Sequence, residues 1–181
     1  MALLIGEDLR LLFTTFEHTA YRLEVRERYG VGYETEPVRQ FLAGEQVDLG
    51  YMGTWLALMT ALTAEGKRVE RVRVVSRPYS NYTRYGLWLC RYNVESGEDI
   101  RYLTREEPSG LPGHDYWLFD SSRLYLMHFD DTDDLLGAEL VEDPAIVVRH
   151  CFWRDAAWHH AVPHAEYVKA AGFAGERPAG A

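Results

Sequence analysis

The chain has 181 residues and a formal net charge of −9, and 47% of its residues are hydrophobic and 26% charged. This composition excludes a largely disordered chain, and the length suits one domain with a sizeable hydrophobic core. The negative charge argues against direct nucleic-acid binding, because proteins that grip phosphate backbones present a basic surface.

The first half of the chain predicts helices that alternate with strands. The spacing of apolar residues predicts helices over residues 7–19, 38–42, 55–64 and 82–93, the last capped by Asn81. Alternation and β-branched side chains predict strands over residues 21–29, 68–76 and 99–104. Short connections marked by glycine join these elements, which predicts a βαβ-like crossover and at least one parallel strand pair.

The second half predicts a strand meander and a closing helix. After a loop rich in Pro and Gly at residues 106–114, strands are expected at residues 116–119, 124–129 and 135–140, with hairpin-type turns between them. A last helix starts at Asp143 and Pro144, and Pro163 ends or kinks it. The expected inner face of this helix consists of Ile146, Val147, His150, Trp153, Ala157 and Ala161.

These elements predict an α+β protein with a single mixed sheet flanked by helices, in which a C-terminal antiparallel meander precedes a long amphipathic helix. Residues 1–171 are expected to form one globular domain and residues 172–181 a disordered tail. The N-terminus lacks the features of a signal peptide, and no apolar run approaches the roughly 18 residues of a membrane span. We therefore expect a cytoplasmic protein without membrane contact.

Several short segments carry a family resemblance, namely F-E-H-T-A-Y-R-L-E, R-V-E-R-V-R-V-V-S, N-V-E-S-G-E-D-I-R-Y-L, W-L-F-D, H-F-D, G-A-E-L and W-R-D-A-A-W-H-H-A-V-P. From about Phe16 to Tyr167 the chain resembles a DUF6879-like family of actinobacterial proteins of unknown function, often encoded beside XRE-type helix-turn-helix regulators. The resemblance implies a soluble accessory protein that acts near a transcriptional regulator. It implies no reaction, no cofactor and no catalytic residue.

The order of segments is also loosely similar to the phospholipase D-like sensory domains attached to some transcription factors. The enzyme motif of that superfamily needs a His, a Lys two residues on and an Asp some four beyond. No His of this chain has a Lys at that distance, and His164 with Lys169 has the wrong spacing. This looser similarity therefore implies a sensor or scaffold without the catalytic motif.

Two groups of residues resemble metal ligands but favour other interpretations. The acidic run of residues 130–134 lacks the central Gly and the terminal Glu of an EF-hand and is typical of a solvated hairpin turn. His160 and His164 have helical metal-ligand spacing, but Pro163 lies between them. Cys90 and Cys151 lack zinc-type spacing and are expected to be buried free thiols. We predict no metal and no cofactor.

One candidate for acid–base chemistry is His128 with Asp120 or Asp130. His128 and Asp130 are two residues apart and therefore share one face of a strand, where a carboxylate can orient an imidazole. The alternative interpretation is that they are ordinary residues on one face of that strand. No nucleophile elbow, Walker loop or dinucleotide-binding fingerprint accompanies them.

Several charged residues on expected core strands and on the last helix need either a partner or a ligand. They can form internal ion pairs, or they can line a shared pocket for an anionic or peptide-like ligand with tryptophans as apolar walls. The candidate ligand-binding residues are Arg22, Glu24, Arg73, Arg101, Trp117, Trp153, Arg154 and Trp158.

The sequence therefore favours a non-enzymatic accessory or sensory protein. We expect it to bind a partner protein or a small anionic ligand in connection with a helix-turn-helix regulator. The alternative is a small cytoplasmic hydrolase-type enzyme that uses His128 with Asp120 or Asp130. The oligomeric state stays open.

Overall fold

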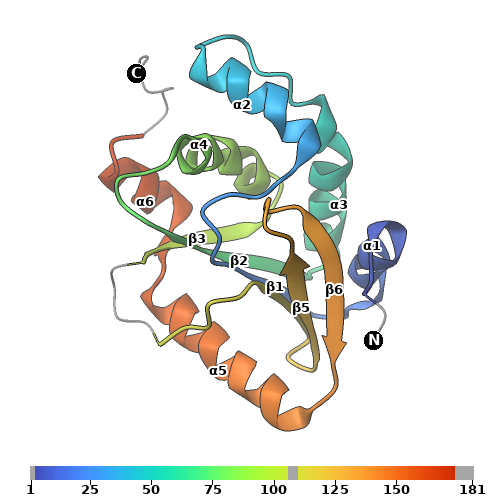
Figure 1. Ribbon diagram of the computed structural model, residues 1–181. Helices are drawn as coiled ribbons and strands as arrows, with labels where there is room; N and C mark the ends of the chain where they lie inside the picture. Colours follow the sequence, from blue (N-terminus) through green and yellow to red (C-terminus); the bar gives the residue numbers. More distant parts are fainter. Residues whose placement is uncertain (1–2, 106–109, 174–181) are drawn as a thin grey trace.

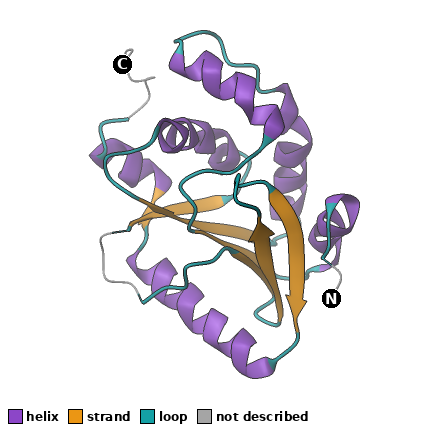
Figure 2. Ribbon diagram, viewed as in Figure 1, coloured by secondary structure: helices purple, strands orange, loops and turns teal. Residues whose placement is uncertain are grey.

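The computed structural model describes residues 3–105 and 110–173, which build a seven-stranded mixed sheet with helices on both faces (Figure 1; Figure 2). The order of strands across the sheet is β6-β5-β4-β1-β2-β3-β7. The strands are β1 Thr19–Glu24, β2 Arg68–Val75, β3 Asp99–Thr104, β4 Tyr116–Phe119, β5 Arg123–Phe129, β6 Leu135–Val141 and β7 Val162–Pro163.

The predicted fold class is confirmed, and so are its two kinds of strand pairing. β1 runs parallel to β2, and β2 runs parallel to β3, as the predicted crossovers require. β4, β5 and β6 form the predicted antiparallel meander, and β4 joins it to the parallel half by pairing antiparallel with β1. The sheet is therefore continuous from the meander to the parallel strands.

Helices α1, α3, α4 and α6 cover one face of the sheet, α2 packs on the outer side of α4, and the long helix α5 covers the other face (Figure 1). We call these the α4 face and the α5 face. The helices are α1 Gly6–Thr15, α2 Thr35–Leu42, α3 Gly53–Ala64, α4 Asn81–Glu95, α5 Pro144–His160 and α6 His164–Ala170, and two 3-10 turns lie at Gly32–Glu34 and Gly50–Met52. None of these described helices is long and apolar enough to cross a membrane.

Hydrophobic packing fixes the sheet on both faces. On the α4 face, the ring of Phe13 makes edge contacts with Trp55 and Trp117, at centroid distances of 5.1 and 4.9 Å. On the α5 face, Tyr21 and Leu23 of β1 pack with apolar residues of α5. Alternate residues of one strand therefore serve two cores, as the pleat of a strand requires.

The structure corrects four boundaries. The helix predicted over residues 7–19 ends at Thr15, and Thr19 begins β1. The strand predicted over residues 21–29 ends at Glu24, because the Val25 N–H leaves the strand ladder and donates to Asp115 Oδ1 at 2.9 Å. α4 is capped by Ser80 rather than Asn81, because Ser80 Oγ accepts from the Thr83 N–H. The helix that Pro163 is predicted to end or kink stops earlier, at His160, and β7 and a further helix, α6, follow it.

The predicted inner face of α5 is correct for Val147, His150, Ala157 and Ala161. Ile146 is exposed instead, as are the two residues before it, Pro144 and Ala145, and the buried face of the helix begins at Val147. The predicted tail at residues 172–181 lies outside the described residues from 174 onward.

Candidate functional site

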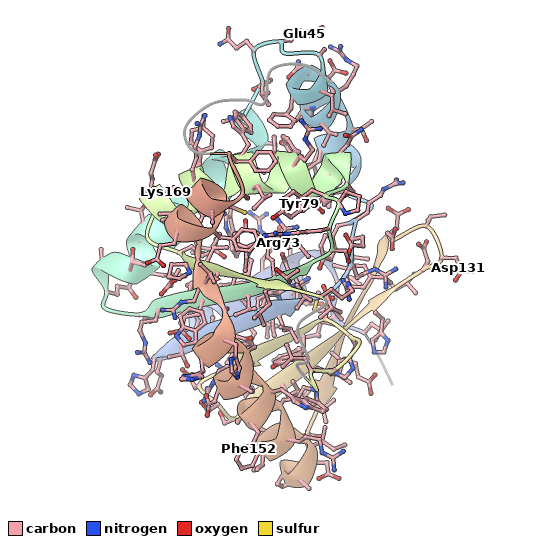
Figure 3. The ribbon with its side chains drawn as sticks, turned by 90° about the vertical axis from the view of Figure 1, so that its left-hand side faces the viewer. Glu45, Arg73, Tyr79, Asp131, Phe152 and Lys169 are labelled. Atoms are coloured by element: carbon pink, nitrogen blue, oxygen red, sulfur yellow. The ribbon has the colours of Figure 1, made fainter. Side chains whose placement is uncertain are left out.

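Six charged side chains meet between the sheet and α4, where Arg73 is labelled in Figure 3. They come together because side chains two residues apart on a strand share a face, and the β1–β2 register places Arg22 beside Arg71 and Glu24 beside Arg73. We call this group the buried ion network. Its members are Arg22, Glu24, Arg71, Arg73, Glu98 and Asp115.

Glu24 lies at the centre of the buried ion network. Its Oε1 is 3.2 Å from Arg71 Nη1 and 3.6 Å from Arg22 Nε, and its Oε2 is 2.9 Å from Arg73 Nε. Arg22 Nε and Glu24 Oε2 are buried and take part in ion pairs without forming hydrogen bonds. The centre of the network is therefore held by charge and by one hydrogen bond, which Arg71 Nη1 donates to Glu24 Oε1.

Asp115 closes one end of the network. Its Oδ2 accepts hydrogen bonds from Arg22 Nη2 at 3.2 Å and from the Tyr29 hydroxyl at 2.6 Å, while its Oδ1 accepts from the Val25 N–H. This carboxylate therefore ties the start of β4 to the end of β1 and to the loop that follows β1.

Glu98 closes the other end. Its Oε1 accepts from Arg71 Nε at 2.8 Å, and its Oε2 accepts from Asn93 Nδ2 at 2.9 Å and from Trp55 Nε1 at 3.3 Å. α3, α4 and β2 are therefore joined through a single carboxylate.

The charges of the network balance, with three guanidinium groups against three carboxylates. Burial disfavours the ionised form of Glu24, but Arg71, Arg73 and Arg22 together outweigh burial and hold the pKa of Glu24 below its usual range. Burial likewise lowers the pKa of Arg71, and Glu24 and Glu98 outweigh it, so the pKa of Arg71 is raised. The network is therefore charged and internally compensated.

The predicted ligand-binding residues divide between the two faces of the sheet. Arg22, Glu24 and Arg73 lie in the buried ion network, and Trp117 lies beside them with its ring centroid 5.4 Å from Arg22 Cζ. Arg101 is aligned with Val72 in the β2–β3 register and therefore points to the α5 face. The eight residues do not line one shared pocket, because the sheet separates them.

The α5 face holds the rest of this set. The Arg101 guanidinium stacks on Trp158, with Cζ 3.8 Å from the ring centroid, and pairs with Asp99. Arg154 donates to Asp155 Oδ1 and Ser121 Oγ. Binding of an anionic ligand by these arginines stays a prediction.

Trp153 belongs to a separate cluster around two histidines. His114 Nε2 and His150 Nε2 are 3.0 Å apart, and His150 Nδ1 is 2.8 Å from the Ile146 carbonyl oxygen. A carbonyl oxygen can only accept a hydrogen bond, so we assign the proton of His150 to Nδ1. His150 Nε2 then accepts a hydrogen bond from His114 Nε2. Burial, above all other effects, lowers the pKa of both histidines.

The structure does not bring His128 to either predicted carboxylate. Asp120 follows β4, at the opposite end of the β4–β5 hairpin from His128, and accepts the backbone N–H groups of Glu17, His18 and Thr19. Asp130 accepts hydrogen bonds within the β5–β6 turn. The carboxylate that His128 meets is Glu139, with Nε2 and Oε2 2.7 Å apart.

The two metal-like groups take other roles. The acidic run of residues 130–134 forms a hairpin turn, as predicted. α5 ends at His160, and His164 begins α6 and packs beside Tyr102. Over residues 3–105 and 110–173, no three His, Cys, Asp or Glu residues form a group that could hold a metal ion.

Three members of the buried ion network were absent from the predicted set. Arg71 carried a signal, because it is two residues before Arg73 on the same alternating strand. Glu98 and Asp115 carried none, because each lies in a loop, and Asp115 is 93 residues away from Arg22.

The outer side of α5 carries large apolar side chains in solvent. Phe152 is 69% exposed and Val148 is 53% exposed, and the two are one helical turn apart. Figure 3 shows Phe152 near the end of the molecule that α5 forms. We call Val148 and Phe152 the α5 outer strip.

Comparison with known proteins returns one family. A family model described as "Domain of unknown function (DUF6879)" matches residues 7–169. No curated protein matches the chain.

Proposed function

Because the chain belongs to the DUF6879 family, a domain family of unknown function, we propose its function from its geometry. The protein is a non-enzymatic accessory protein that binds a partner protein through the α5 outer strip. The observation that carries this proposal is the exposure of Phe152, at 69%, in the middle of a regular helix whose opposite side is buried.

The chemistry of the α5 outer strip supports a protein partner. An exposed aromatic side chain can bury a large area in a partner's pocket at a small cost in conformational entropy, which is why aromatic residues dominate binding energy at interfaces. Val148 and Phe152 have the i, i+4 spacing with which a helix presents apolar anchors to a groove. A partner with an apolar groove or helix face fits this surface.

The buried ion network supports a scaffolding role. A general acid or base needs a pKa near the working pH and access to its substrate. Glu24 has a lowered pKa and is buried beside three arginines, so its carboxylate neutralises these arginines and does not contact a substrate. The network instead ties α3, α4 and three strands into the platform that α5 packs against from the other face.

We propose an XRE-type helix-turn-helix regulator as the partner, because the family resemblance implies that such regulators are encoded beside proteins of this kind. An acidic protein with a formal charge of −9 is suited to a regulator with a basic DNA-binding surface. A sensory role of the phospholipase D-like type is compatible with such a complex and stays a prediction.

Calorimetric titration of the purified protein with the purified regulator tests the proposal. Phe152→Ser and Val148→Ser should each weaken binding about tenfold or more, because truncating an anchor at the centre of an interface costs about 2 kcal/mol or more and about 1.4 kcal/mol is tenfold. Tyr33→Ser is the matched control, since Tyr33 is 67% exposed but lies far along the chain in the turn Gly32–Glu34. Regulator binding that is unchanged in Phe152→Ser, or no binding by the wild type, contradicts the proposal.

A hydrolase-type enzyme is the second candidate, and one observation favours it. His128 and Glu139 form a partly exposed pair with Nε2 and Oε2 2.7 Å apart, which is the geometry of an oriented general base. This reading predicts turnover of an activated ester or phosphate ester that His128→Ala abolishes. If the protein turns over neither ester class, the hydrolase proposal is wrong.

A further inference from the structure

β6 is the outermost strand on the meander side of the sheet and is seven residues long, whereas β7 at the other side has two. Its exposed side chains are apolar. Leu136 is 51% exposed and Leu140 is 38% exposed, and Leu135 is exposed as well. Proteins commonly protect such an edge with lysine or proline, and β6 contains neither.

The open side of β6 already accepts a short piece of backbone. The Leu4 N–H donates to the Ala138 carbonyl at 2.8 Å, and the Ala138 N–H donates to the Leu4 carbonyl at 2.9 Å. Because the hydrogen-bonding direction alternates along an antiparallel strand, Leu140 presents its own N–H and carbonyl on the same open side as Ala138. The residue pair Leu4 and Ala138 therefore occupies only the middle of the edge.

Gly137 makes room for this crossing. Its φ is +145°, and a Cβ at this position would lie 2.7 Å from Leu3 Cβ and 2.9 Å from the Leu4 carbonyl oxygen. A side chain there would push the passing backbone away from the strand. The edge is thus shaped for close approach by an extended segment, which here is Leu3 to Ile5.

The surroundings of the edge are strongly acidic. Residues 124–148, which span β6 and both of its flanks, contain seven Asp and Glu residues and no Lys or Arg, and of these carboxylates Asp133 already pairs with Arg26. Asp131 projects at the tip of the β5–β6 hairpin (Figure 3), and Glu7 and Asp8 are exposed in the first turn of α1. Such charges attract basic side chains and repel a second copy of the same edge.

We infer that the open edge of β6 binds an extended segment of a partner protein in which apolar and basic residues alternate. The segment adds a strand to the sheet beyond β6 and displaces the two hydrogen bonds that Leu4 makes. Its apolar side chains replace Leu4 and contact Leu140, and its basic side chains meet the carboxylates around the strand. This surface is separate from the α5 outer strip.

A labelled peptide of alternating valine and lysine is the probe, with fluorescence anisotropy as the readout. We expect binding that falls about tenfold or more when glutamate replaces lysine, because like charges then face each other. A peptide of equal charge with alternate valines replaced by proline should also lose binding, because it cannot form strand hydrogen bonds. Equal binding of the valine and proline peptides would mean charge attraction alone and would overturn the inference.

Variants of the protein locate the site. Leu140→Pro removes an outward N–H and Leu140→Thr removes apolar area, and both should weaken the valine–lysine peptide. Deleting residues 1–5 removes the competing segment and should tighten binding.

Phe152→Ser should bind the peptide like the wild type, which separates this test from that of the α5 outer strip. Hydrogen exchange that slows at Leu140, whose N–H is open in the free protein, supports the inference. Unchanged exchange there, or formation of a dimer through β6, overturns it.

Discussion

Glu24 is the residue on which the α4 face depends most. Three guanidinium groups converge on its carboxylate, which no other residue in the buried ion network experiences. A buried carboxylate of this kind neutralises charges whose isolation inside the protein would be costly. Because the pKa of Glu24 is lowered on folding, its stabilising contribution is present above its unfolded pKa and is lost as the pH falls through its folded pKa.

Replacing Glu24 by Gln tests this role with almost no change in shape. We expect the free energy of unfolding in urea to fall by about 3–5 kcal/mol, because three buried arginines lose their shared counter-charge. Glu36→Gln is the matched control, since Glu36 pairs with Arg39 in solvent and its removal should change stability little. A Glu24→Gln protein as stable as the Glu36→Gln protein would show that the network contributes nothing to folding.

The histidine pair predicts a loss of stability in mild acid. Burial is the main cause that lowers the pKa values of His114 and His150. At His114, the charge of Asp115 raises the pKa and His128 lowers it further. At His150, Arg149 also lowers the pKa. Protons therefore bind the unfolded chain more tightly than the folded one. Stability should be constant above the unfolded histidine pKa of about 6.5 and should decline as the pH falls through it.

His114→Leu should flatten this decline, because one titrating group disappears and His150 loses the repulsion of its neighbour. The measurement is the free energy of unfolding at a series of pH values between neutrality and mild acid. His18→Gln, at an exposed histidine, should keep the wild-type slope. If the slope in His114→Leu equals that of the wild type, the pair does not control acid stability.

At the scale of elements, local patterns predicted much of the fold. The alternation of Val and Arg in β2 places Arg71 and Arg73 on one face, and the structure confirms it. The meander and the parallel crossovers also follow from strand spacing and connection length. These features are local, so a single sequence contains the information for them.

Features that depend on distant contacts could not be predicted. β7 has two residues, including Pro163, and exists because it pairs with β3. Asp115 ends the first strand early by capturing the Val25 N–H from 90 residues away. Nothing in the neighbourhood of either residue indicates its partner, and for the same reason the sequence could not separate Arg101 from Arg73.

Gly86 in α4 provides a test at the scale of a helix. A Cβ at Gly86 would lie 2.6 Å from Arg73 Nη1, whose guanidinium is held by Glu24. Gly to Ala in a helix normally stabilises by about 1 kcal/mol, but here we expect a lower melting temperature because Arg73 must move. Gly53→Ala in α3, where no atom lies within 4 Å of the added Cβ, should be neutral or stabilising. A stabilised Gly86→Ala protein would contradict the close packing of α4 on Arg73.

At the scale of the whole molecule, a tightly packed interior supports two exposed apolar surfaces. The interior is fixed by the buried ion network and by hydrophobic clusters on both faces of the sheet, whereas the outer side of α5 and the edge of β6 expose apolar side chains to solvent. A rigid platform with two exposed apolar surfaces is suited to joining partners. The α5 outer strip contains an aromatic side chain, Phe152, whereas the exposed side chains of β6 are leucines.

Hydroxyl-radical footprinting of the protein alone and with the regulator measures the role of the α5 outer strip directly. Phe152 is exposed and reactive in the free protein, so its oxidation rate reports on whether a partner covers it. We predict a strong decrease in oxidation of Phe152 in the complex, with Tyr33 oxidised at an unchanged rate. Equal oxidation of Phe152 in the free and bound protein, in a sample where the complex is fully formed, would contradict binding through α5.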